Sequence, residues 1–191
     1  TVLTRKAAAV TANELGAVGI NLNFAPVLDV HSNPDNPVIG DRAFSRDPRT
    51  VGALGQVIAR EFQKRGVLAC GKHFPGHGDT SVDSHLDLPV VERPLESLEA
   101  IELAPFRSVI DQELASIMTA HVMYPALDPK HPATLSQAIL TELLRKKMRF
   151  NGLIISDNLE MKALWGRYEP KELMVKALAA GCDLFIGGGG G

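Results

Sequence analysis

The sequence has little of several residue classes, and each shortage excludes a class of protein. Lysine and arginine number 20 against 22 acidic residues, the formal net charge is −2, and no basic stripe occurs. Nucleic-acid binding needs clustered cations that neutralise phosphates, so we expect no nucleic-acid partner. No apolar run approaches the roughly 20 residues of a membrane span, so we expect no membrane partner either.

Cysteine is also scarce. Cys70 and Cys182 are the only two, and they stand apart, in or beside apolar segments. We expect buried free thiols rather than a disulfide, which fits a reducing, cytoplasmic location. The chain opens at Thr1 without methionine, so an upstream signal peptide stays open. It closes on Gly187–Gly191, a run typical of a ragged or artificial end, and we expect a fragment.

Short apolar runs alternate with amphipathic segments along the whole chain. Most of these runs are continuous, as in parallel strands that are buried on both faces. The strands expected from them are Ile20–Leu28, Val67–Gly71, Ala115–Ala120, Leu153–Ser156 and Asp183–Ile186.

The segments between these runs carry one apolar stripe at helical spacing, which predicts helices. One stripe consists of Val51, Leu54, Ile58 and Phe62, with Gly66 as its C-terminal stop. Another consists of Leu140, Leu143, Leu144 and Met148, with Asn151-Gly152 as its stop.

Repeated strand–helix units predict a parallel α/β fold, either doubly wound or a barrel. Polar and glycine-rich loops follow the strands, where barrel active sites lie, and no glycine-rich dinucleotide turn follows any strand. We therefore predict a TIM (β/α)8 barrel. Because a complete barrel takes roughly 250 residues, we expect residues 1–191 to form a partial catalytic barrel of about five units. It would lack its N-terminal and C-terminal units.

The densest group of reactive side chains follows the second expected strand. It comprises Lys72–Asp79 (KHFPGHGD) and then Asp83–His85 (DSH). Packing gives no reason for a buried strand to end in a lysine and two histidines. In an extended segment residues two apart point the same way, so Asp83 can reach the His85 ring. A carboxylate on one ring nitrogen fixes the tautomer and makes the other nitrogen a better base.

A further carboxylate ends the fourth expected strand, in Leu153–Met161 (LIISDNLEM). Two interpretations of Asp157 stay open. It is either the N-cap of a helix over Leu159–Trp165 or a nucleophile that faces the Asp83/His85 pair. We favour the nucleophile and expect Glu160 to lie on the helix.

The loop Ile39–Phe44 (IGDRAF) follows the first expected strand. Its Arg42 either clamps a hydroxyl or carboxylate of a ligand or pairs with Asp41 or Asp47. The residues alone leave both open. We expect Asp29 to brace this region rather than react.

These motifs resemble those of the bacterial β-N-acetylhexosaminidases of glycoside hydrolase family 3, single-domain enzymes that remove N-acetylglucosamine from peptidoglycan fragments. The resemblance covers nearly the whole chain. It runs through APVLDV at Ala25–Val30, GDR at Gly40–Arg42, KHFPGHG at Lys72–Gly78, DSH at Asp83–His85, MTAH at Met118–His121 and SDNLEM at Ser156–Met161.

The resemblance implies a covalent nucleophile at Asp157 and a general acid/base at His85, oriented by Asp83. The residues it implies as sugar contacts are Arg42, Lys72 and His73. It requires no metal or other cofactor, and we expect none. The expected partner is a small carbohydrate, an N-acetylglucosaminyl glycoside, and the expected full-length protein is a monomer. The family's acidic, glycine-rich opening segment is missing here, so activity of the 191 residues alone is a separate question.

Several alternatives stay open. A family 3 β-glucosidase shares the Lys-His loop and the Ser-Asp strand but takes its acid/base from another domain. A glycoside phosphorylase uses the same covalent intermediate with an anionic acceptor. A metal-dependent barrel hydrolase is suggested by His73, His77, His85, Asp83 and Asp157, although the usual early His-x-His is missing. The last alternative is a non-catalytic or inactive sugar-binding fragment.

Overall fold

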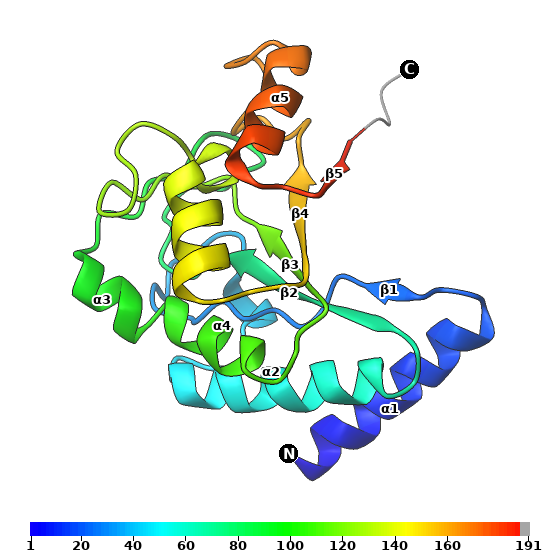
Figure 1. Ribbon diagram of the computed structural model, residues 1–191. Helices are drawn as coiled ribbons and strands as arrows, with labels where there is room; N and C mark the ends of the chain where they lie inside the picture. Colours follow the sequence, from blue (N-terminus) through cyan, green and yellow to red (C-terminus); the bar gives the residue numbers. More distant parts are fainter. Residues whose placement is uncertain (188–191) are drawn as a thin grey trace.

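The computed structural model describes residues 1–187. Five strands form one parallel sheet in which each strand pairs with the next along the chain (Figure 1). They are β1 (Leu22–Asn23), β2 (Leu68–Phe74), β3 (Ser116–Thr119), β4 (Leu153–Asn158) and β5 (Leu184–Ile186). A doubly wound sheet reverses its strand order at a switch point, whereas this order advances without reversal, as it does in a barrel. The ragged end predicted at Gly187–Gly191 lies outside the described residues from residue 188 onward.

The helices lie around the outer side of the curled sheet (Figure 1). The α-helices are α1 (Val2–Ala17), α2 (Pro48–Gln63), α3 (Leu95–Ala100), α4 (Leu103–Ile110) and α5 (Pro170–Ala180). Two short 3-10 helices, η1 (Gly40–Arg42) and η2 (Ala133–Leu135), and one π-helix, η3 (Ala138–Lys147), complete the set. None of the helices in residues 1–187 is long and apolar enough to cross a membrane. The fold is therefore an α/β half-barrel, as the strand–helix alternation predicts.

Local chemistry sets the ends of the helices. The Asp47 carboxylate accepts hydrogen bonds from the backbone N–H groups of Arg49 and Thr50 and so caps α2. Gly66 has a φ of 77° after that helix, which confirms its predicted role as a stop. The second stripe ends earlier than predicted. Helix η3 ends at Lys147, and Arg149, with a φ of 58°, turns the chain before Asn151-Gly152 is reached.

The first strand is much shorter than the predicted Ile20–Leu28. Only Leu22 and Asn23 are regular strand. Pro26 has no N–H to donate to a ladder, so regular pairing stops before it. Its carbonyl still accepts from the Lys72 N–H at 3.0 Å, and the Ala25 carbonyl accepts from the Cys70 N–H at 2.9 Å. The segment therefore stays beside β2 without forming a continuous strand.

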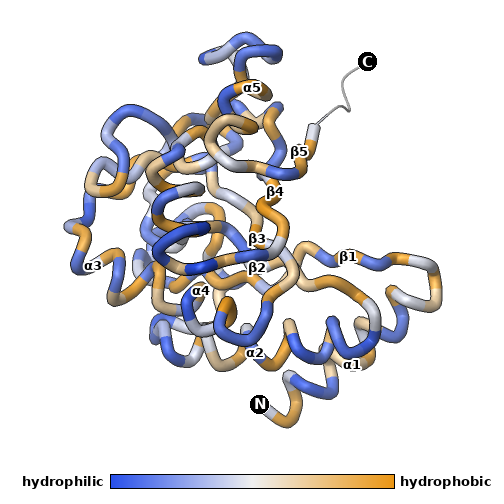
Figure 2. Tube along the Cα trace, in the orientation of Figure 1, coloured by the Kyte–Doolittle hydropathy of each residue, from blue (hydrophilic) through white to orange (hydrophobic). Residues whose placement is uncertain are grey.

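The two faces of the sheet carry separate apolar clusters. The larger lies between the strands and the outer helices and includes Ile117 and Ile154. The smaller lies on the inner face and consists of Cys70, Met118 and Ile155, with Leu22 and Ile186 against it. Both faces are apolar because parallel strands with helices outside and a packed interior bury each of them. Figure 2 shows the hydrophobic stretches that result along the strands.

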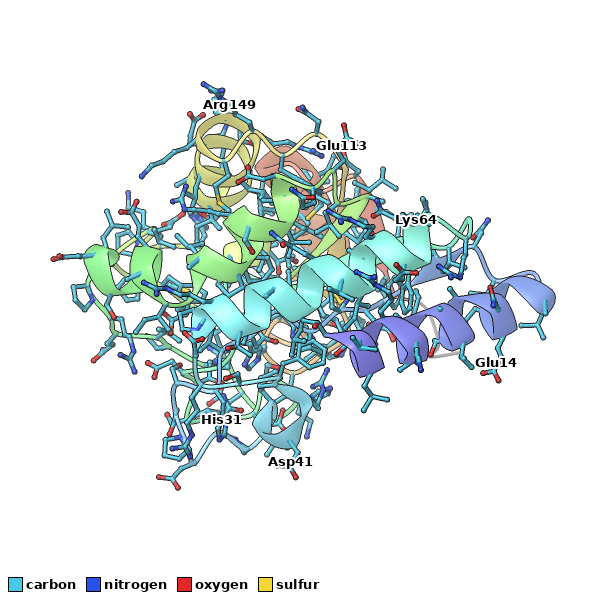
Figure 3. All side chains as sticks on the ribbon, turned by 90° about the horizontal axis from the view of Figure 1, so that it is seen from below. Glu14, His31, Asp41, Lys64, Glu113 and Arg149 are labelled. Carbon is cyan, nitrogen blue, oxygen red and sulfur yellow. The ribbon has the colours of Figure 1, made fainter. Side chains whose placement is uncertain are left out.

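The strand ends define two opposite rims of the molecule. Glu113 and Arg149 precede β3 and β4, so they mark the amino-terminal rim. His31 and Asp41 belong to the loop that follows β1, on the carboxyl-terminal side. Figure 3 shows the two pairs on opposite sides of the molecule. The loops that carry the predicted reactive residues all leave from the carboxyl-terminal rim.

Candidate active site

Lys72 and Asp157 extend the inner face of the sheet at the carboxyl-terminal rim. Lys72 lies two residues after the inner-facing Cys70, and Asp157 lies two residues after the inner-facing Ile155. Burial lowers the pKa of Lys72, the nearby Arg42 charge lowers it further, and the Asp157 carboxylate opposes both. Lys72 and Asp157 therefore interact, and both are only partly buried.

Asp29 organises the loop after β2 from beneath. Its carboxylate is fully buried and accepts hydrogen bonds from the His73 ring at 2.7 Å, the His73 N–H at 3.2 Å and the His77 N–H at 2.6 Å. Burial acts to raise the pKa of Asp29, but these contacts with His73 and His77 outweigh it and the pKa is lowered. Asp29 is therefore a brace, as predicted, but the loop that it holds is the one after β2 and not the Ile39–Phe44 loop of the prediction. Because His73 Nδ1 donates to Asp29, its Nε2 is the ring nitrogen that Asp29 does not use.

Asp83 and His85 form the predicted hydrogen-bonded pair, but the predicted extended backbone is wrong. The segment is a turn, in which the N–H groups of Leu86 and Asp87 donate to the Asp83 carbonyl. The Asp83 carboxylate accepts from the His85 backbone N–H and from Nδ1 of its ring, each at 2.8 Å. Slight burial raises the pKa of Asp83, but these bonds from His85 outweigh it and the net shift is downward. The His85 side chain is 62% exposed, so Nε2 is accessible to a substrate or to water.

Arg42 lies on η1 and is exposed. Its Nη1 donates to the Val38 carbonyl at 3.4 Å. Within residues 1–187 it forms no ion pair with Asp41 or Asp47, and Asp47 is occupied instead as the cap of α2. The guanidinium charge acts to lower the pKa of Lys72, so Arg42 lies near Lys72.

Asp157 lies inside β4, and turns rather than a helix follow it directly. Residues 159–164 form turns because the Asn158 side chain accepts from the Glu160 N–H at 3.0 Å and the Ala163 N–H donates to the Ser84 carbonyl at 3.2 Å. The predicted helix over Leu159–Trp165 is therefore wrong, and Glu160 lies in a turn. The N-cap interpretation of Asp157 falls with that helix.

Comparison with known proteins assigns the family. The sequence model described as "Glycosyl hydrolase family 3 N terminal domain" matches residues 2–187. The chain belongs to glycosyl hydrolase family 3. Among its family 3 relatives is a beta-hexosaminidase of Neisseria meningitidis serogroup C (strain 053442), 45% identical over 177 residues, 93% of this chain and 48% of that protein. Beta-hexosaminidase A of Pseudoalteromonas piscicida is 40% identical over 95% of this chain and 32% of its own length.

Solved structures of the family agree with the fold. A family 3 β-N-acetylglucosaminidase from Paenibacillus sp. str. FPU-7 superposes with a TM-score of 0.95 at 46% identity, over 97% of this chain and 36% of that one. NagZ from Neisseria gonorrhoeae in complex with N-trifluoroacetyl-D-glucosamine superposes with a TM-score of 0.87 at 40% identity, over 96% of this chain and 52% of that one. The chain thus spans about half or less of the length of these relatives. The predicted barrel class is confirmed.

His121 is a residue of this family 3 site to which the sequence reasoning assigned no role. It follows β3 and is buried, with Nε2 2.9 Å from the Asn158 carbonyl and Nδ1 2.7 Å from the Thr134 hydroxyl. Burial lowers the pKa of His121, so the ring is neutral. Because a carbonyl only accepts, Nε2 carries the proton and donates it to the carbonyl of Asn158, the residue after Asp157. The position of His121 directly after an apolar strand is the sequence feature that could have indicated a role in the site.

The predicted site residues lie on the strand ends and loops of the carboxyl-terminal rim. The Asp157 carboxylate acts to raise the pKa of both Lys72 and His121, and the Arg42 guanidinium acts to lower that of Lys72. Asp157 therefore lies on the same rim as Lys72, as predicted. Within residues 1–187 no three histidine, cysteine, aspartate or glutamate side chains gather where they could hold a metal ion. Cys70 and Cys182 are buried free thiols, also as predicted.

Proposed function

We propose that this chain is part of the catalytic barrel of a retaining β-N-acetylhexosaminidase. Its substrates are terminal N-acetylglucosaminides, including peptidoglycan-derived glycosides, and its catalytic residues are Asp157, His85 and Asp83. The observation that carries the proposal is the 2.8 Å hydrogen bond between Asp83 and His85 on the rim where β4 delivers Asp157. The named activities of the family 3 relatives support it.

In the first step the Asp157 carboxylate attacks the anomeric carbon of the sugar and forms a glycosyl ester. His85 donates a proton from Nε2 to the departing oxygen, so that the leaving group departs as an alcohol. Asp83 stabilises the protonated ring through Nδ1 and keeps Nε2 towards the substrate. A histidine performs this role near neutral pH without the deep burial that a carboxylic acid needs.

In the second step neutral His85 takes a proton from water, which attacks the anomeric carbon and releases Asp157. Two inversions at one carbon give net retention. The sugar is held by Lys72, Arg42 and the free Nε2 of His73, which convert binding energy into alignment. No residue of this mechanism requires a metal. The buried thiols favour a reducing compartment, and the proposal includes a cytoplasmic location.

The test is turnover by the full-length protein of a nitrophenyl N-acetyl-β-glucosaminide beside the matching β-glucoside, with and without phosphate. We expect turnover of the N-acetylated substrate, release of β-configured N-acetylglucosamine, and no acceleration by phosphate. Preference for the glucoside would favour a β-glucosidase. A glycosyl phosphate product would favour a phosphorylase, and binding without turnover would favour a sugar-binding protein.

A further inference from the structure

Two buried residues of the loop after β2 have no role in the proposed reaction. Ser84 lies between Asp83 and His85, yet it is buried while His85 is exposed. The three residues lie in a turn, in which the N–H groups of Leu86 and Asp87 donate to the Asp83 carbonyl at 2.9 and 3.0 Å. The turn places Ser84 against the protein and leaves His85 towards solvent. His77 belongs to the preceding turn and is also buried.

The two side chains are in contact. Nε2 of His77 lies 3.1 Å from Oγ of Ser84, and the other ring nitrogen lies 2.8 Å from Oγ1 of Thr80. The backbone N–H of His77 donates to the buried carboxylate of Asp29 at 2.6 Å, and this bond fixes the position of the histidine. Burial lowers the pKa of His77 to about 4, so the ring stays neutral at working pH. It therefore offers one N–H and one lone pair to the two hydroxyls.

Ser84 is held from a second direction by its backbone. Its carbonyl accepts from the Ala163 N–H at 3.2 Å, and Ala163 belongs to the segment that follows Asp157. An Arg167–Asp87 ion pair joins the same two loops nearby. Fixing the side chain and the carbonyl of one residue fixes the backbone on both sides of it. The contact therefore links the loop of Asp83 and His85 to the segment of Asp157.

We propose that His77 and Ser84 form a positioning pair that holds the Asp83/His85 dyad at reaction distance from the sugar bound beside Asp157. The inference rests on the proposed function, because it assigns what keeps that dyad in place. Misplacing a catalytic group by about 1 Å costs about 100-fold in rate, so an anchor in the middle of the motif has a large kinetic effect. The pair acts through the dyad and touches no substrate itself.

The decisive variant is Ser84→Ala in the full-length protein, with Ser84→Thr as the conservative change. Ser81→Ala is the matched control, because Ser81 is an exposed serine of the same loop. We expect Ser84→Ala to lower kcat about 10- to 100-fold on an alkyl N-acetyl-β-glucosaminide, whose departure needs the acid. A nitrophenyl substrate should still form the ester, which should accumulate and be released by azide, a nucleophile that needs no base. Ser84→Thr should keep most activity, and Ser81→Ala should match the wild type.

His77→Phe is the second variant, since it keeps a ring and removes both ring nitrogens. It should show the same ester accumulation, and its effect should not add to that of Ser84→Ala if the two residues act as one unit. Equal losses on both substrates without an ester or azide rescue would overturn the inference and indicate general disruption. So would a Ser84→Ala protein that behaves like Ser81→Ala. A wild-type protein that forms no ester at all would instead refute the proposed function.

Discussion

At the scale of single residues, Asp29 has the most concentrated set of contacts in the site. One buried carboxylate accepts two backbone N–H groups and one imidazole N–H, and so fixes both histidines of the loop. A buried ionised group with all its partners present is stable, but removal of its charge leaves several donors unpaired.

Asp29→Asn should therefore lower the free energy of unfolding by about 3 kcal/mol at pH 7, because the amide cannot accept from every donor. The pKa of Asp29 is lowered in the folded state, so its stabilisation is full above its ordinary value of 3.8 and is lost as the pH falls below it. The difference in the free energy of unfolding between wild type and Asp29→Asn should thus become smaller below about pH 4. Urea unfolding across that range measures it. Asp35→Asn, an exposed carboxylate after the same strand, should change stability by less than about 0.5 kcal/mol at every pH.

The acid/base pair makes a kinetic prediction at the same scale. His85→Ala should slow alkyl glycosides more than nitrophenyl glycosides, since only the former need a proton on the leaving oxygen. Asp83→Ala should have a smaller effect, because Asp83 only orients and polarises the ring. It should change the ratio of the alkyl-glycoside rate to the nitrophenyl-glycoside rate by about tenfold or less. Steady-state kinetics on the two substrates provide the measurement. A metal-bound water mechanism would instead lower both substrates together in both variants.

At the scale of elements, Gly78 shows how closely the two loops of the rim approach. A Cβ at this position would lie 1.6 Å from the Val30 carbonyl oxygen, which is backbone and cannot turn aside. The amide of Asn36 binds the His77 and Gly78 carbonyls at 2.8 and 3.0 Å and holds the same approach from the other loop. Glycine is therefore required here for space.

Gly78→Ala should destabilise the protein by about 3 kcal/mol or push the loops apart, and in either case reduce turnover. Gly16→Ala is the control, because that helical glycine has nothing within 4 Å of a new Cβ. Gly16→Ala should raise the free energy of unfolding by about 0.5 kcal/mol, because alanine reduces the conformational entropy of the unfolded chain. Thermal unfolding of both variants measures the contrast, and a Gly78→Ala protein as stable as the wild type would contradict the close approach.

The sequence predicts elements well where local chemistry is sufficient and fails where distant contacts decide. The buried runs of β3 and β4 are apolar on both faces, so composition alone reveals them. The segment after Asp157 looks helical but is held in turns by Ser84, far away in sequence. The spacing predicts the Asp83–His85 bond, but the turn that makes it and the burial of Ser84 against His77 both require the folded loop. His121 lacked a role because its partner, the Asn158 carbonyl, is a backbone atom.

At the scale of the whole molecule, the described chain is an open sheet with apolar side chains at both ends. Exposed apolar residues lie on the two end helices: Val2, Leu3 and Val10 on α1, and Met174, Val175 and Leu178 on α5. Strands β1 and β5 are the edges of the described sheet. Exposed edges and apolar faces promote association.

The isolated 191-residue chain should therefore associate. Its mass measured by light scattering should exceed the monomer mass of 20.6 kDa and should increase with protein concentration. Leu178→Lys should shift the mass towards the monomer by placing a charge on the apolar face of α5. Lys171→Gln, at an exposed polar position on the same helix, should leave the association unchanged. A sharply melting monomer at every concentration would show this prediction to be wrong.

The most direct test of the mechanism is to trap the covalent intermediate. The full-length His85→Ala protein is mixed with a fluorinated or nitrophenyl N-acetyl-β-glucosaminide, and its intact mass is measured, followed by peptide mapping. Nucleophilic attack by Asp157 predicts a mass increase of one sugar, located on Asp157, and no turnover or adduct in Asp157→Ala. Absence of any adduct in the His85→Ala protein, together with an active Asp157→Ala protein, would contradict the covalent mechanism.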